Sequence, residues 1–200
     1  AAVTTGASSC IERAVITNGA AFTEGAGATT EDACVLVPAF DMDDCTFGCS
    51  TFLDMPASGS TLPESSGKSC YKSTAAIALT GLTLSGDADY VFVTPAALTT
   101  AADSVVDGAK SVKWCIGAAV VLGAGSIIQG SIESGAAVNT GASSEVIGNI
   151  FATAAVNTGA TSTVHGDISA GAAINTGAGA CAQSNTYHGG ALTRGAGATF

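Results

Sequence analysis

Residues capable of acid–base chemistry are few and scattered in this sequence. His165 and Asp167 stand two positions apart, a spacing that places both on one face of a strand. From residue 115 to 200 there are only three acids and one base, namely Glu133, Glu145, Asp167 and Arg194. This is too sparse for the paired carboxylates with a basic neighbour that acid–base catalysis requires. We therefore expect His165 to be a solvated histidine and the protein not to be an enzyme.

Metal ligation is equally weakly supported. The acidic run DMDD at 41–44 offers carboxylates for calcium, but no EF-hand spacing follows it, which favours a solvated acidic loop. The seven cysteines form no CxxC pair and lie far from His165 and His188, which argues against zinc. Disulfides are the better interpretation, and an odd count leaves at least one thiol free or paired between chains. We expect no metal, no cofactor and a secreted protein whose signal peptide has been removed.

Composition and charge exclude further classes of function. The formal net charge of −10 and the pI of about 4.2 argue against nucleic acid and anionic membranes as partners, because both attract basic surfaces. The longest uncharged apolar run, 114–125, is too short to span a bilayer. Much of the 47% hydrophobic content is alanine, and glycine numbers 26. The core must therefore be thin and filled by small branched side chains.

A heptapeptide repeat sets the architecture. AAVNTGA occupies 136–142 and 154–160, AAINTGA occupies 172–178, and residues 1–7 read AAVTTGA. Glycines and aliphatic residues recur at a constant interval of 18 residues. The columns are Gly123, Gly141, Gly159, Gly177 and Gly195; Val120, Val138, Val156, Ile174 and Leu192; Ile128, Val146 and Val164; and Ile132, Ile150 and Ile168. This period predicts an all-β, three-sided parallel β-solenoid with 18-residue coils, branched residues inward and glycines at corners. A left-handed hexapeptide solenoid is less consistent, because its aliphatic residues recur every six positions.

The chain divides into three parts within one predicted domain, 1–200. Residues 1–30 carry the coil pattern through Gly6, Ile11 and Val15, and 71–200 form the main coils. Residues 31–70 hold four cysteines and break the pattern, which indicates an irregular, disulfide-tied insertion or cap. Such a cap would protect an open solenoid end from edge-to-edge pairing. Residues 96–110 (AALTTAADSVVDGAK) have the propensity for a short helix.

The stretch from 54 to about 180 resembles the microbial ice-binding (antifreeze) protein family with a discontinuous β-solenoid. The matching segments are LPESSGKSCYKSTAAIALTGLTLSGDADYVFV at 62–93, LTTAADSVVDGAKSVKWCIG at 98–117 and LGAGSIIQGSI at 122–132. The resemblance implies a right-handed solenoid whose first coil is separated from the rest by an excursion. It also implies that the last coil lies beside the first, so that AAVTTGA and ALTRGAGATF are neighbours. The family's long helix has no good counterpart, because residues 20–60 are rich in Gly, Thr, Asp and Cys.

The resemblance further implies that the repeat carries the ice-binding face. Relatives have a T-A/G-x-T/N type of motif, and the aligned words here are AAVN, AAVN and AAIN, which match at the last position and have Ala at the first. A flat ladder of small, uncharged groups suits a crystalline surface, because a rigid array loses little ordering entropy on binding. The candidate face consists of Thr4, Ala137, Asn139, Thr153, Ala155, Asn157, Ala173, Asn175 and Thr193.

Two alternatives stay open at this point. The same smooth face could seat another segment or subunit, and asparagine ladders stabilise stacked strands without any ligand. The second function that we consider is a secreted structural protein that self-assembles into an extracellular fibre or sheath by solenoid stacking. The odd cysteine, the low charge of the repeat half and a sequence that stops mid-coil at Phe200 support it. The expected partners are thus an ice surface and, alternatively, further copies in a homo-oligomer or filament.

Overall fold

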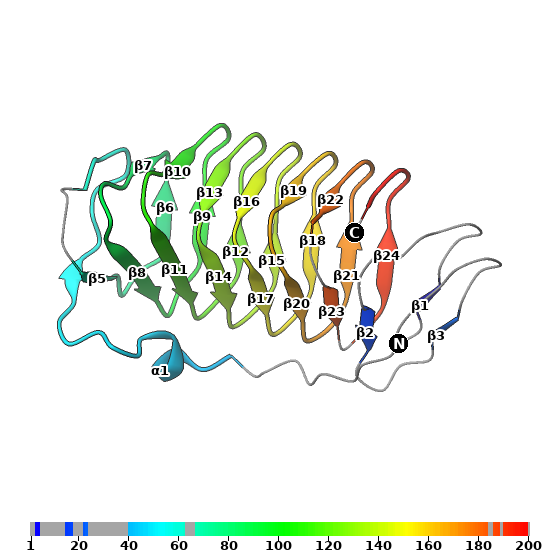
Figure 1. Cartoon of the computed structure of the whole chain (residues 1–200), viewed down its shortest axis with the longest axis horizontal. Coiled ribbons are helices and arrows are strands. Elements are labelled where there is room, and N and C mark those ends of the chain that lie inside the picture. The colour runs from blue at the N-terminus through cyan, green and yellow to red at the C-terminus, as the bar shows by residue number, and fades with distance from the viewer. Residues whose placement is uncertain are drawn as a thin grey trace.

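The computed structural model describes residues 40–62, 67–183 and 190–199 in full, and the backbone of the strands at 3–4, 15–17, 22–23 and 186–188. These residues form a parallel β-solenoid with three faces, and its coils run side by side along the long axis of Figure 1. The predicted all-β solenoid is therefore confirmed.

Each face is one parallel sheet. Sheet 1 has nine strands in the order β3 (Phe22–Thr23), β1 (Val3–Thr4), β24 (Leu192–Arg194), β21 (Ile174–Thr176), β18 (Val156–Thr158), β15 (Val138–Asn139), β12 (Val120–Val121), β9 (Leu98–Thr100) and β6 (Ile77–Leu79). Sheet 2 has six, in the order β22 (Cys181–Ala182), β19 (Thr163–Val164), β16 (Glu145–Ile147), β13 (Ile127–Gln129), β10 (Val105–Asp107) and β7 (Leu82–Thr83). Sheet 3 has nine, in the order β2 (Val15–Thr17), β23 (Thr186–His188), β20 (Ile168–Ala170), β17 (Ile150–Ala152), β14 (Ser131–Ser134), β11 (Ser111–Ile116), β8 (Asp89–Thr94), β5 (Lys68–Lys72) and β4 (Leu53–Asp54).

The core has the residues that the repeat predicts. Val138 pairs with Val156, Val146 with Val164 and Ile150 with Ile168, and the partners in each pair are one period of the repeat apart. The three aliphatic columns point inward, and most of their side chains have no exposed surface. Stacked side chains of similar shape fill the narrow interior, so each coil repeats the packing of the one before.

The coils between residues 71 and 120 are longer than the repeat predicts. Leu98 pairs with Val120 and Tyr71 pairs with Phe92, and both steps exceed the period of the later coils. Here aromatic rings replace isoleucine in the inward column of sheet 3. The rings of Tyr71 and Phe92 stack 5.4 Å apart, and those of Phe92 and Trp114 stack 4.4 Å apart. The larger side chains and the longer coils therefore occur together.

The glycine column marks a corner where coils touch directly. A Cβ atom added to Gly159 would lie 2.4 Å from the carbonyl carbon and oxygen of Gly141, and one on Gly177 would lie 2.5 Å from the carbonyl carbon of Gly159. No larger residue fits these positions at the spacing of stacked coils.

The ends of the sequence meet, as the resemblance implied. β1 pairs in parallel with β24 through Val3 and Leu192, and β2 pairs with β23 through Val15 and Thr186. The first coil therefore lies against the last one. The main ladder begins at the other end with β4, where Leu53 pairs with Tyr71. β3 and β4, which follow one another among the described strands, therefore lie at opposite ends of the solenoid.

The described part of the cysteine-rich segment (40–62 and 67–70), called the cap below, is tied to the solenoid by two disulfides. It contains the four-residue helix α1 (Met42–Cys45), whose N-terminus is capped by the Asp41 side chain. Cys45 is bonded to Cys115 on β11, and Cys49 is bonded to Cys70 on β5. Among the described cysteines, Cys181 forms no disulfide. Cys10 and Cys34 lie outside the described residues.

The expected helix at 96–110 is wrong. This segment forms β9 and β10, with Leu98 and Val106 buried in the core. Local propensity is a weak effect, and pairing with the coils on both sides outweighs it. The only helix within the described residues is α1, in the cap.

Candidate functional site on sheet 1

The outer surface of sheet 1 carries one continuous column of small and medium side chains. The strand register places them in the order Ala78, Thr99, Val121, Asn139, Asn157, Asn175 and Thr193. None of these side chains is charged, and neighbouring members are separated by the strand spacing of about 4.8 Å. A second column lies two residues earlier on each coil, about 6.7 Å away along the strand, and includes the candidates Ala137, Ala155 and Ala173.

The three asparagines form a hydrogen-bonded ladder. The Asn157 Nδ2 donates to Asn139 Oδ1 at 2.7 Å, and the Asn175 Nδ2 donates to Asn157 Oδ1 at 2.7 Å. Each amide has two N–H donors and an oxygen with two lone pairs. Asn157 therefore keeps one donor and one acceptor for the solvent side, with the plane of its amide held by both neighbours.

The remaining candidate residues lie around this ladder. The three candidate alanines are half-buried and directly precede the inward aliphatic residue of their coil. Thr193 is exposed on β24 next to Asn175. Thr153 is exposed at the corner where sheet 3 turns into sheet 1, and its amide donates to the Ser134 carbonyl at 3.0 Å. Thr4 lies on β1, and its side chain is outside the described residues.

Buried groups behind the face hold it rigid. Val138, Val156 and Ile174 have no exposed surface. Thr140 is buried directly after β15, and its Oγ1 accepts from the Gly159 amide on the next coil at 3.1 Å. The face is thus backed by a buried aliphatic layer and by hydrogen bonds between coils. Its outward groups are fixed in position before any contact is made.

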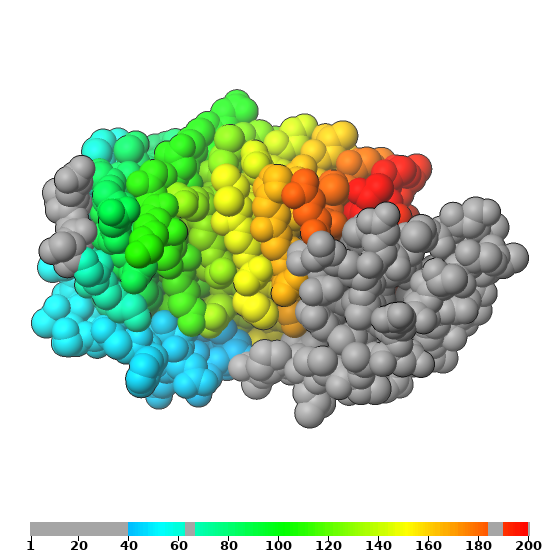
Figure 2. Space-filling view, in the orientation of Figure 1, coloured from blue at the N-terminus to red at the C-terminus, as the bar shows by residue number. Residues whose placement is uncertain are grey.

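The cap covers part of the outer surface of sheet 3. Val91, Val93 and Cys115 lie on its outer side and are buried beneath the cap together with Cys45. The cap lies along this side of the solenoid in Figure 2. Sheet 1 carries no such cover in the described residues of its central coils, where Asn139, Asn157 and Asn175 are half-buried only by one another and their neighbours.

Sheet 2 has a different chemistry. Its outer surface carries the exposed Val105 and Ile147 and an ionisable cluster around His165. The His165 Nε2 lies 2.7 Å from Glu145 Oε1, and its Nδ1 lies 2.8 Å from Gln183 Oε1. Sheet 2 is therefore less uniform than sheet 1.

The expectation that His165 and Asp167 share a face of one strand is wrong. β19 ends at Val164 and β20 begins at Ile168, so the two residues flank the corner at Gly166. The backbone amide of Asp167 donates to Asn149 Oδ1 on the preceding coil at 2.9 Å, which holds this corner in place.

Sequence reasoning missed three residues of the outward column. Ala78, Thr99 and Val121 continue it into the earlier coils, where the constant step of the repeat gives way to longer coils. Counting from the inward aliphatic residue of each coil, rather than from a fixed period, would have found them.

In the described part of the chain there is no group of three or more His, Cys, Asp or Glu side chains arranged for a metal ion. No helix of this part is long and apolar enough to cross a membrane.

The fold and this surface define a disulfide-tied β-solenoid that displays a flat, uncharged ladder. The family model described as ice-binding-like matches residues 54–158, and the chain belongs to this family. No curated protein matches the sequence, and no solved structure matches it. Family membership supports ice binding as the general function, and the family and fold together indicate a protein that is not an enzyme. The disulfides and the family are consistent with an extracellular protein.

Proposed function

We propose that the protein adsorbs to ice through the outer surface of sheet 1. The observation that supports this most directly is the amide ladder Asn139–Asn157–Asn175, which holds identical polar groups at one spacing. Family membership points to ice as the ligand. The outward column carries no charge, which distinguishes this face from sheet 2.

The physical basis is preorganisation. Ice presents a repeating array of water molecules, so recognition requires many weak contacts at fixed spacings. The half-buried Ala137, Ala155 and Ala173 offer methyl groups over which water can order, and the free amide groups of the ladder can anchor that water. Because the ladder fixes the side-chain rotamers beforehand, little conformational entropy is lost on contact. Thr153 and Thr193 add hydroxyl groups at the margins of the face.

A matched pair of bulky substitutions tests the choice of face. Asn157→Tyr places a large ring in the middle of sheet 1. Thr163→Tyr places the same ring on sheet 2 of the same coil, at a position that is also half-buried. We expect Asn157→Tyr to lose most thermal hysteresis and ice-affinity partitioning, and Thr163→Tyr to retain both. Circular dichroism and the unfolding midpoint check that each variant is folded.

The reverse pattern would reject this face. If Thr163→Tyr abolished ice partitioning and Asn157→Tyr did not, ice would contact sheet 2. If the unmodified protein neither shaped ice crystals nor entered ice at high concentration, ice binding itself would be wrong.

The second candidate function is structural self-assembly by solenoid stacking. β4 and β6 are the terminal strands of sheets 3 and 1 in the described chain, and a terminal strand can pair with another chain. Sedimentation over a range of concentrations tests this function. Open-ended growth supports it, and a species that stays monomeric at all concentrations contradicts it.

A further inference from the structure

The two disulfides that tie the cap to sheet 3 lie in different surroundings. Cys45 is 2% exposed, and its partner Cys115 has no exposed surface. Cys49 is half-buried, and its partner Cys70 is 4% exposed. Thiol–disulfide exchange begins when a thiolate reaches a sulfur atom, so access to the bond limits its rate. Cys49 therefore offers a reductant the most accessible point of attack on either bond.

The part of the cap that these bonds hold is residues 40–51, called the latch below. None of its residues pairs with a strand of sheet 3 in the described part of the chain. The latch is held instead by the two disulfides, by side-chain packing and by Lys68, whose Nζ donates to the Phe47 carbonyl oxygen at 2.6 Å. Its covalent bonds are therefore its main attachments to the solenoid.

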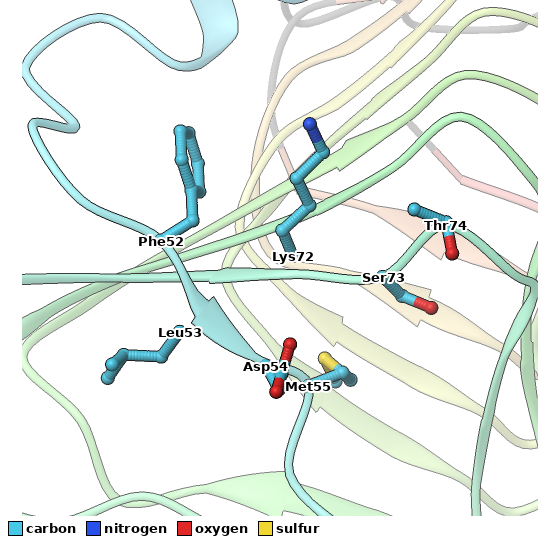
Figure 3. A pocket seen from close by; sticks show the side chains of 7 residues that line it. All are labelled: Phe52, Leu53, Asp54, Met55, Lys72, Ser73 and Thr74. Carbon is cyan, nitrogen blue, oxygen red and sulfur yellow. The ribbon is translucent and has the colours of Figure 1, made fainter.

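The latch ends where β4 begins. Leu53 pairs with Tyr71 and Asp54 pairs with Lys72, so strand pairing rather than a disulfide holds the next part of the cap. Figure 3 shows Phe52 and Lys72 extending side by side near this strand, and the Lys72 Nζ lies 5.7 Å from the centre of the Phe52 ring. Loss of both disulfides would therefore free the latch and leave β4 on the sheet.

The latch covers an apolar strip on the outer side of sheet 3. Val91 and Val93 on β8 are 3% and 4% exposed, and they form one buried cluster with Cys115 on β11. Met42 and Cys49 of the latch pack against this cluster. β8 lies between β5 and β11, the two strands to which the disulfides run. Opening of the latch would therefore expose the strip to water.

We propose that the two disulfides form a two-stage redox latch that responds to a dithiol reductant. Cys49–Cys70, the outer disulfide, opens first, because Cys49 is the accessible partner. Its loss frees one side of the latch, while Cys45 still holds α1 on β11. Cys45–Cys115, the inner disulfide, then becomes reachable, and its reduction releases the latch and uncovers the strip on β8.

Each stage is an ordinary two-electron exchange. A thiolate of the reductant attacks the Cys49 sulfur, forms a mixed disulfide with it and releases Cys70 as a thiolate, which takes up a proton. The second thiol of the reductant then attacks its own sulfur in the mixed disulfide. The reductant leaves as a cyclic disulfide, and Cys49 leaves as a thiol. Two electrons and two protons thus pass to the protein, and the inner disulfide is reduced by the same steps.

Timed reduction of the full chain by dithiothreitol tests the order of the stages. Thiols that are free at the start are blocked with iodoacetamide. Samples taken during reduction are quenched with acid, denatured and labelled with N-ethylmaleimide, and the labelled cysteines are located by mass spectrometry. We expect Cys49 and Cys70 to be released about 10-fold faster than Cys45 and Cys115. The fluorescence of anilinonaphthalene sulfonate, which binds exposed apolar surface, should rise with the second event only.

A matched pair of variants distinguishes a latch from two independent bonds. Cys49→Ala/Cys70→Ala removes the outer disulfide, and Cys45→Ala/Cys115→Ala removes the inner one; circular dichroism checks that each is folded. In the first variant, the inner disulfide should be reduced without delay and about 10-fold faster than in the unmodified chain. In the second variant, the outer disulfide should be reduced at the rate of the unmodified chain.

Several results would overturn the proposal: reduction of both disulfides at one rate, reduction of Cys45–Cys115 before Cys49–Cys70, or a rise of dye fluorescence with the first event. These measurements use the unmodified chain, so they decide the matter even if a variant fails to fold. An inner disulfide that is reduced no faster in Cys49→Ala/Cys70→Ala than in the unmodified chain would overturn it as well. The latch lies over sheet 3, so the outcome is independent of the proposed ice-binding face on sheet 1.

Discussion

The asparagine ladder predicts an unequal set of stability losses from three chemically identical substitutions. Asn157→Ala removes two amide hydrogen bonds, whereas Asn139→Ala and Asn175→Ala remove one each. A hydrogen bond of this kind contributes about 0.5–1 kcal/mol net, because water replaces the partner at a half-exposed site. We expect the free energy of unfolding to fall by about 1–2 kcal/mol for Asn157→Ala and by about half as much for each end of the ladder. The intrinsic cost of replacing Asn by Ala in a strand is common to all three and cancels in the comparison.

Urea unfolding followed by the fluorescence of Trp114 measures these differences. Trp114 is fully buried and stacked on Phe92, so its emission reports loss of the core. A double-mutant cycle adds a second criterion. Asn139 and Asn157 should show a coupling of about 0.5–1 kcal/mol, whereas Asn139 and Asn175 should be additive within about 0.5 kcal/mol. Equal losses for the three single variants, or coupling between the two ends, would refute the ladder and with it the claim that the ice-contact groups are fixed beforehand.

Two further predictions concern the corner and the aromatic core. Gly159→Ala should lower the free energy of unfolding by about 1–3 kcal/mol, because its Cβ would meet Gly141 at 2.4 Å. Ala160→Val, at the exposed neighbouring position, should change the free energy of unfolding little. Equal effects of the two substitutions in thermal unfolding would contradict the steric argument. Burial, and secondarily repulsion from Tyr90, raises the pKa of Tyr71 above its ordinary value of 10.0. Tyr71 therefore ionises first in the unfolded chain as the pH rises, so its contribution to stability should be constant below about pH 10 and fall above it. Tyr71→Phe should remove part of that alkaline decline, and an unchanged decline would show that Tyr71 is not its cause.

The repeat predicted the central part of the fold because stacking imposes one environment on each column. Val138, Val156 and Ile174 occupy equivalent positions, so a single periodic pattern identifies them all. The prediction was weaker where coils change length, and Val121 and Thr99 were missed for that reason. Residues 96–110 were misjudged because helix propensity is local, whereas β9 and β10 depend on pairing with strands of the next coil along the chain.

The candidate site could likewise be predicted from the sequence only in part. The asparagine column follows from the period, but the direction of its hydrogen bonds depends on three-dimensional placement. The cap could be predicted only as a cysteine-rich interruption. Which cysteines pair is determined by the strands that the cap crosses, and Cys45 reaches Cys115 across 70 residues of sequence.

The contact between the first and last coils has a consequence for how the molecule is made. β1 pairs with β24, so a strand that leaves the ribosome early must wait for a partner that is synthesised much later. The coils from β5 onward add to one another in sequence order, each on an edge that already exists. The first coil instead closes the edge that the last coil leaves open. Such long-range closure is slow, because loop entropy is lost before the contact is gained. Closure of the fold is therefore coupled to synthesis of β24, because β1 can pair with this strand only after it has been made.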